Sequence, residues 1–177
     1  VAFEVAGLNL FYGNKQALLR QVVQRYVCRA TAGLRTLRDG DLRSSLLQFA
    51  VDYLEHFNQP HVAQACRLIN ADSAQFPDEA RTLYHDGSGS LQLHLAEWIE
   101  SACQRGQLRH DDPHFMAELL MSMIAGLDLD RQRFFVPHRD AATQRRRWAE
   151  FSVDSFLRAF APTLPPAPHT NQLRSFS

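Results

Sequence analysis

The chain has 177 residues, with 19 basic and 19 acidic side chains and a formal net charge of zero. This length suffices for one well-buried core and makes two separate domains improbable. No run of about 18 apolar residues occurs, because Glu118 interrupts the most apolar stretch, so we expect no membrane span. Three widely spaced cysteines form neither a CxxC pair nor a zinc spacing, which fits a reducing cytoplasmic location.

Basic residues are concentrated at the N-terminal end. Residues 1–40 contain six basic and two acidic side chains, a net charge of +4, whereas the remainder has 13 basic and 17 acidic ones, a net charge of −4. This asymmetry places any affinity for an anionic polymer such as DNA at the N-terminal end. A solvated, arginine-rich helix face would give the same pattern, so that alternative stays open.

A glycine near the N-terminus separates an apolar segment from a helix. Gly13 suits the left-handed residue that ends a helix, and Asn14 can cap the next helix. Lys15 then lies in the first turn, where a positive charge opposes the helix dipole. That small cost is understandable if a phosphate group also lies at this helix start.

The sequence of residues 8–19, LNLFYGNKQALL, resembles the end of the DNA-binding domain in the tetracycline-repressor (TetR) family of bacterial regulators. The resemblance implies a helix-turn-helix head that binds double-stranded operator DNA. By the same resemblance Asn9 points into the major groove, Phe11 and Lys15 lie along the phosphate backbone, and Tyr12 packs inward at this DNA-binding surface. A helix-turn-helix needs more than the five residues between Gly7 and Gly13. We therefore expect residues to be missing between Gly7 and Leu8, and before Val1.

Apolar residues recur at three- and four-residue spacing along the chain, and no run alternates like a strand, which predicts an all-α fold. The predicted helices cover about residues 14–32, 42–57, 60 to a break at 76–77, 77 to near 86–89, 90–105, 114–134 and 139–160. Asp112 and Pro113 are a strong helix start, with the aspartate as cap and the proline in the first turn. The segments 67–77 and 105–113 are also similar to the TetR-family body.

Three regions are predicted from these elements and from the resemblance. Residues 1–32 form a partial helix-turn-helix domain with its connecting helix, residues 33–161 form a helical effector-binding and dimerisation domain, and residues 162–177 form a proline-rich tail.

The helix predicted at 114–134 is too apolar for one small core to cover. Only Glu118 and Ser122 are polar between Phe115 and Leu127, so a second surface must bury the rest. Small residues at helical spacing on the last helix allow close helix approach, which predicts a four-helix seam between two copies. A monomer with two central helices is the alternative. The predicted homodimer interface consists of Ser122, Gly126, Trp148, Ser152, Ser155 and Ala159.

Aromatic and sulfur-containing side chains recur on the inward helix faces between residues 42 and 123, with few polar ones among them. This composition is typical of a largely apolar small-molecule site. The predicted ligand-binding residues are Phe49, Tyr53, Tyr84, His94, Trp98, Met116 and Met123. Each could instead be an ordinary core residue, and a hydrogen-bonded core histidine remains the simpler interpretation of His94.

Potential metal ligands are dense only at residues 110–114, where His110, Asp111, Asp112 and His114 lie close in sequence. Pro113 keeps the two histidines off one helical face, so a structural turn is favoured over a metal site. No nucleophile triad, phosphate-binding glycine loop or nucleotide motif occurs, so we expect neither enzymatic activity nor a cofactor.

The sequence therefore predicts a TetR-like, DNA-binding repressor that a small apolar or aromatic effector releases from its operator. The alternative is a helical small-molecule-binding protein or enzyme that reuses the body without binding DNA.

Overall fold

A computed structural model describes residues 41–136 and 139–162, together with Ala17, Arg20, Gln21, Gln24 and Val27 nearer the N-terminus. These five positions are helical, and all of them fall within the helix predicted at 14–32. Within the described residues every regular element is a helix, which confirms the predicted all-α class. The predicted boundary at residue 32 and most of the predicted tail lie outside the described residues, so these limits stay predictions.

The described helices follow one another in a simple order. They are α2 (Leu42–Phe57), α3 (Pro60–Asp72), α4 (Pro77–Tyr84), a π-helical turn η1 (His85–Gly89), α5 (Ser90–Gln104), α6 (Pro113–Ala125), α7 (Asp128–Arg133) and α8 (Ala142–Ala159). Local sequence explains the helix starts, since proline occupies the first turn of α3, α4 and α6. Asp41 accepts a bond from the amide of Ser44, and Asp112 accepts from His114 and Phe115, so the predicted cap of α6 is confirmed.

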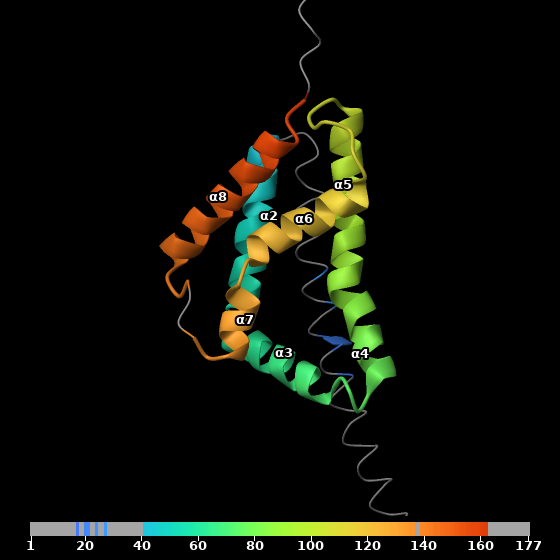
Figure 1. Ribbon diagram of the computed structural model, residues 1–177, viewed down its shortest axis with the longest axis vertical. Helices are drawn as coiled ribbons and strands as arrows, with labels where there is room; N and C mark the ends of the chain where they lie inside the picture. The colour runs from blue at the N-terminus through green and yellow to red at the C-terminus, as the bar shows by residue number, and fades with distance from the viewer. Residues whose placement is uncertain are drawn as a thin grey trace, which may run out of the picture.

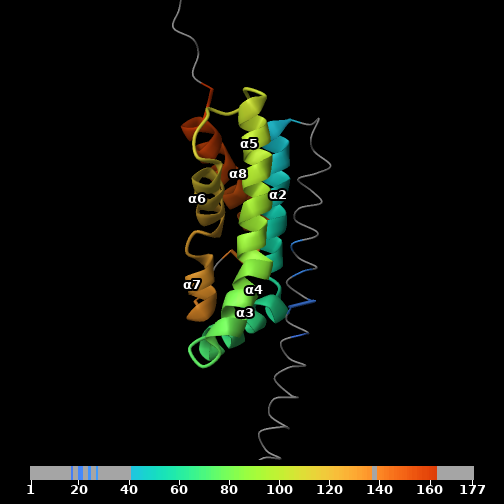
Figure 2. The ribbon, with the colours of Figure 1, turned by 90° about the vertical axis from the view of Figure 1, so that its right-hand side faces the viewer.

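The long helices α2 and α5 both run along the length of the body, with α8 outside α2 in Figure 1 and the two long helices nearly parallel in Figure 2. Helix α3 crosses between the lower ends of α2 and α4, and α6 crosses higher up, toward the middle of α5 (Figure 1). Helix α6 packs on α5 and α8, while α8 packs along α2. The lower half of the body is thereby bounded by α2, α3, α4 and α7.

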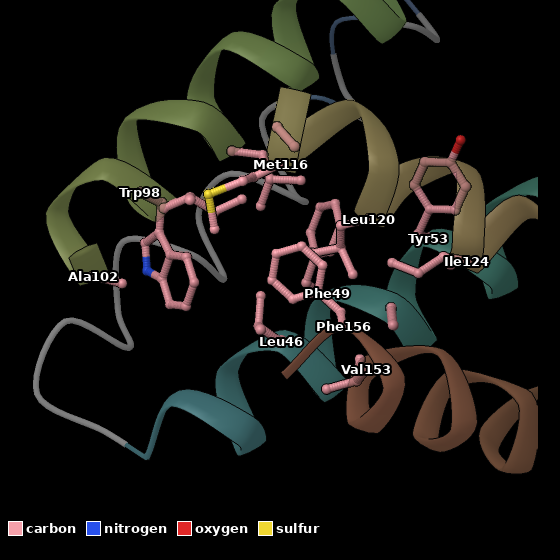
Figure 3. Packing of buried hydrophobic residues seen from close by; sticks show 14 of the residues in the cluster. Leu46, Phe49, Tyr53, Trp98, Ala102, Met116, Leu120, Ile124, Val153 and Phe156 are labelled. Atoms are coloured by element: carbon pink, nitrogen blue, oxygen red, sulfur yellow. The ribbon is translucent and has the colours of Figure 1, made fainter. Parts of the chain in front are cut away.

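The hydrophobic core fills the upper half, where α2, α5, α6 and α8 meet (Figure 3). Each helix contributes an inward stripe at three- and four-residue spacing, such as Leu46, Phe49 and Ala50 on α2. Leu120 of α6 and Phe156 of α8 are completely buried between these stripes. Tyr53 lies at the edge of this cluster, with its hydroxyl group turned away from Phe49 (Figure 3).

The predicted break near residues 86–89 is wrong. Helix α4 continues through the π-helical turn η1 directly into α5, although Asp86, Gly87, Ser88 and Gly89 are residues that usually stop a helix. The wider turn keeps the chain helical and brings Tyr84 close to Gly89, where an added Cβ would lie 3.3 Å from the Tyr84 carbonyl oxygen and 3.4 Å from ring atom Cε1.

The helix predicted at 114–134 is also wrong as a single element. Gly126 ends α6 with φ at +52°, a conformation that side chains other than glycine rarely adopt. A Cβ at this position would lie 3.1 Å from Cζ2 of Trp148, so the indole ring packs directly against the glycine. The chain turns there and resumes as the short helix α7, and α8 begins at Ala142 rather than at Arg139.

Candidate ligand-binding cavity

A cavity of about 410 Å³ lies in the lower half of the body, between α2, α3, α4, η1 and α7. Its aromatic wall is formed by Tyr53 and Phe57 of α2 and Tyr84 of α4, and aliphatic residues of α3, α4 and α7 complete the apolar lining. This volume falls in the range of sites for small organic molecules. The cavity can therefore accommodate one apolar or aromatic ligand of moderate size.

Polar side chains border the cavity at a few positions. His56, Cys66, Arg67, Asn70 and Gln132 all line it. Nε2 of Gln132 donates a hydrogen bond of 2.8 Å to the carbonyl oxygen of Phe57, which joins α7 to the end of α2. Apolar walls alone would allow a ligand to bind in several orientations, and these polar groups can favour one of them.

Two ionisable groups on the wall have pKa values raised by burial. Burial raises the pKa of Tyr53 to about 12, and it also raises the pKa of the Cys66 thiol. Both groups are neutral at pH 7 at their ordinary pKa values, and burial extends this neutral state to higher pH.

The structure places the seven predicted ligand-binding residues in three environments: the cavity wall, the core and the exposed surface. Tyr53 and Tyr84 line the cavity. Phe49, Trp98 and Met116 are buried in the core above it, and Met123 packs against that core. His94 is exposed, and its ring nitrogen Nδ1 lies 2.7 Å from the carbonyl oxygen of Ser90.

The lining residues of α3 were missed by the sequence analysis, although Cys66 and Arg67 form part of the wall. Helix α3 carries only a short apolar stripe, and none of its residues was predicted to bind a ligand. The signal that could have found it is that Val62, Cys66 and Ile69 share a helix face while polar residues flank them closely.

An ion pair connects the cavity wall to the helix near the N-terminus. Nε of Arg20 lies 3.4 Å from Oδ2 of Asp86, which belongs to the η1 turn. The neighbouring residues Gly87 and Ser88 line the cavity. The ion pair thus joins Arg20 to the turn that borders the cavity.

A second group of contacts fixes the junction between α6, α7 and α8. Asp128, at the start of α7, is buried and pairs with Arg131 and Arg139. The guanidinium group of Arg139 lies 3.9 Å from the centre of the Trp148 ring, and Nε1 of Trp148 donates to the carbonyl oxygen of Ile124 at 2.9 Å. Helix α7 thus links the cavity to the ends of α6 and α8.

The predicted interface residues occupy two different environments. Ser122, Gly126 and Ala159 are exposed, and Ser155 is half-buried. Ser152 is only 1% exposed, and its hydroxyl group donates to the carbonyl oxygen of Met123, so it is buried within its own chain.

Trp148 also makes its main contacts within the chain, through Gly126 and Ile124. The neighbouring residue Phe151, which the prediction omitted, is 60% exposed and stacks on Trp148. On the exposed face of α8, Phe151 therefore takes the place that the prediction gave to Ser152. On α6 the large exposed apolar side chains are Phe115 and Leu119.

The four predicted DNA-binding residues, Asn9, Phe11, Tyr12 and Lys15, lie outside the described residues, as does the expected gap after Gly7. Within residues 41–136 and 139–162 and the five described positions before them, no group of three acidic, histidine or cysteine side chains is arranged to hold a metal ion. No helix in this same part of the chain is both long and apolar enough to cross a membrane.

Comparison with known proteins places these features in a family. Residues 44–162 match the family model of the C-terminal domain of AefR-like transcriptional repressors, within the TetR group. None of the curated proteins compared with the chain matches it.

Two solved structures have the same fold. A protein described as a TetR-family transcriptional regulator from Mesorhizobium loti superimposes with a TM-score of 0.76 at 20% identity, over 88% of this chain and 80% of that one. The flavonoid-responsive regulator FrrA superimposes with a TM-score of 0.69 at 25% identity, over 90% of this chain and 81% of that one. The family match covers more than half of the chain and all of α3 to α8, and the chain therefore belongs to the TetR family of transcriptional regulators.

Proposed function

We propose that this TetR-like repressor acts in the cytoplasm as a homodimer and leaves its operator when a small aromatic molecule occupies the cavity between α2, α3, α4, η1 and α7. The observation that carries this proposal is the cavity itself, with Tyr53, Phe57 and Tyr84 on its wall. Aromatic side chains favour flat, apolar ligands through ring stacking and buried area.

The comparison with FrrA supports an aromatic effector. That protein is described as responding to flavonoids, and it is 25% identical to this chain over most of its length. A flavonoid combines fused and single aromatic rings with a few hydroxyl groups. The polar side chains at the border of this cavity, such as His56 and Asn70, suit a ligand of that type.

Release of DNA requires that the ligand bind better to one arrangement of the body than to another. We infer that the η1 turn distinguishes the two arrangements, because Gly87 and Ser88 face the cavity while Asp86 contacts Arg20. A ligand that displaces η1 shifts the helix that carries Arg20. By family resemblance that helix leads from the DNA-binding head, whose proposed contacts are Asn9, Phe11, Tyr12 and Lys15.

The dimer interface is proposed on the exposed faces of α6 and α8. Phe115, Leu119 and Ser122 are spaced along one face of α6, and Phe151, Ser155 and Ala159 along one face of α8. Phe115 and Phe151 are 71% and 60% exposed in the single chain, which leaves much apolar area for a second copy to cover. A symmetric dimer would present two heads to successive major grooves.

Binding of the full-length protein to labelled DNA from upstream of its own gene tests this function. We expect specific, salt-dependent binding that is lost when a flavonoid such as naringenin is added, with random DNA of equal length as control. Absence of specific binding in every condition would contradict the repressor function. If naringenin bound to a protein without affinity for DNA, the alternative of a small-molecule-binding protein or enzyme would be favoured.

A further inference from the structure

The charged residues that line the cavity are all of one sign. Arg67 of α3 and Arg133 of α7 are on the wall, His56 lies nearby, and none of the described lining residues is acidic. Arg133 is 3.8 Å from Asp130, which partly neutralises it, whereas no carboxylate in the described part of the chain lies within ion-pair distance of Arg67. The positive charge of Arg67 is therefore available to a ligand.

The guanidinium group of Arg67 lies over an aromatic ring, with its central carbon 4.9 Å from the centre of the Phe135 ring. A cation–π contact does not consume the N–H groups of the guanidinium, and these can donate hydrogen bonds to the two oxygens of a carboxylate.

The backbone conformation of Phe135 is fixed by the end of α7. Its backbone lies in the left-handed region with φ at +55°, and the amide of Val136 donates to the carbonyl oxygen of Arg131 at 2.9 Å, which closes the end of α7. Phe135 is 78% exposed, so the ring that contacts Arg67 faces solvent. The cation thus marks the outer end of the cavity, and buried residues such as Val62 and Gly87 mark its inner end.

We propose that the effector is an amphiphilic organic acid, with an aromatic body in the inner part of the cavity and a carboxylate bound by Arg67 at the outer end. This inference rests on the proposed effector-binding function and narrows its ligand class. A strongly hydrophilic anion is disfavoured, because most of the wall could not replace its lost water. A cationic ligand is disfavoured because it would meet Arg67 and Arg133 without a compensating carboxylate on the wall.

Calorimetry on the full chain with two acid and amide pairs tests the proposal: 2-naphthoate with 2-naphthamide, and 4-phenylbutanoate with 4-phenylbutanamide. Each amide keeps the shape of its acid and removes the charge. We expect the acid to bind about tenfold more tightly than the amide in at least one pair, as a charge-assisted hydrogen bond at a partly exposed site provides. In Arg67→Gln the dissociation constants of acid and amide should become nearly equal. In Arg67→Lys part of the preference for the acid should remain.

The matched control is Arg146→Gln, which removes the same charge from α8, where Arg146 pairs with Glu150 outside the cavity. This variant should keep the full preference for the acid. Equal affinity within both pairs, binding of none of the four compounds, or a preference that survives Arg67→Gln would overturn the proposal. A neutral flavonoid that releases DNA while the acids show no preference would leave the repressor function standing and defeat this inference alone.

Discussion

Arg20 and Asp86 are 66 positions apart in sequence, and their side chains meet at 3.4 Å, joining the helix near the N-terminus to the turn that borders the cavity. Asp86 is displaced from the regular helix path by the π-helical geometry of η1. π-Helical turns are rare and are often found at functional sites. The pair is therefore a specific place at which occupancy of the cavity and the position of the head can be coupled.

Removing this contact should weaken the coupling and leave binding at each site nearly intact. In Asp86→Asn we expect the ratio of DNA affinities without and with effector to fall about two- to fivefold, the range that one partly exposed ion pair supports. Fluorescence anisotropy with labelled operator measures it. Asp78→Asn is the control, because Asp78 pairs only along α4 with Arg81. An unchanged ratio in Asp86→Asn would show that the Arg20–Asp86 pair does not couple effector binding to DNA binding.

The exposed aromatic residue Phe151 should be essential for dimerisation. In Phe151→Glu a carboxylate would have to be buried in the proposed interface, so we expect the dimer to dissociate at least about a hundredfold more readily. Sedimentation equilibrium at micromolar concentration measures the change. Phe134→Glu is the matched control, since Phe134 is 70% exposed at the end of α7 and outside the two stripes. A wild-type monomer, or a dimer that tolerates Phe151→Glu, would contradict the proposed interface.

Gly126 provides a test of the junction between α6 and α8. Gly126→Ala combines an unfavourable φ of +52° with a Cβ at 3.1 Å from Trp148, so we expect the free energy of unfolding to fall by about 1–3 kcal/mol. Gly106→Ala is the control, because Gly106 has φ of +70° but no atom within 4 Å of an added Cβ. Urea denaturation of both variants measures the extra loss at Gly126, where ψ of −131° and the contact with Trp148 act together. Equal losses would mean that the indole ring moves aside without cost.

The reaction rate of the Cys66 thiol should show whether the cavity holds a ligand. Burial raises the pKa of its thiol, so the reactive thiolate is scarce and reaction with a disulfide reagent at pH 8 should be slow. A bound effector should slow the reaction further, by about tenfold at saturation. A form whose only cysteine is Cys103 is the control, because that thiol bonds to the carbonyl oxygen of Arg109 and does not line the cavity. Protection of both thiols alike would point to general stabilisation instead.

The raised pKa of Tyr53 leads us to expect that the protein loses stability at high pH. Its pKa is about 12 in the folded chain and about 10 in an unfolded one, so the unfolded chain releases the proton first. The contribution of the neutral hydroxyl is complete below pH 10 and is lost as the pH rises toward 12. Urea denaturation between pH 9 and 11.5 should show a steeper decline for the wild type than for Tyr53→Phe. Parallel curves would contradict the raised pKa.

The sequence predicted the elements whose signals are local. Pro60, Pro77 and the Asp112–Pro113 pair mark three helix starts correctly, because caps and proline act within one turn. The break expected at 86–89 is absent, because Gly87 and Gly89 belong to the π-helical turn η1, which keeps the chain helical from α4 into α5. The end of α6 was missed because the contact of Gly126 with Trp148, which lies 22 positions later, is not visible in the local sequence.

The cavity was only partly predictable. Tyr53 and Tyr84 were expected and line it, whereas the arginine and cysteine of α3 were not expected. Periodicity shows which helix face turns inward, but it cannot show whether that face meets another helix or an empty volume. Phe49 and Trp98 have the same pattern as Tyr53 and are nevertheless fully packed in the core. The difference depends on where α3 and α6 cross the body, which is a property of the assembled fold.

The η1 turn has a consequence for how cavities of this kind can diversify. A π-helical turn holds about one residue more than an α-helical turn within the same full rotation of the chain. Loss of one residue from His85–Gly89 would therefore restore an α-helical turn and leave Tyr84 in register with the buried stripe of α5. The cavity wall at Gly87 and Ser88 could thus change by one residue while the side chains of α4 and α5 keep their faces.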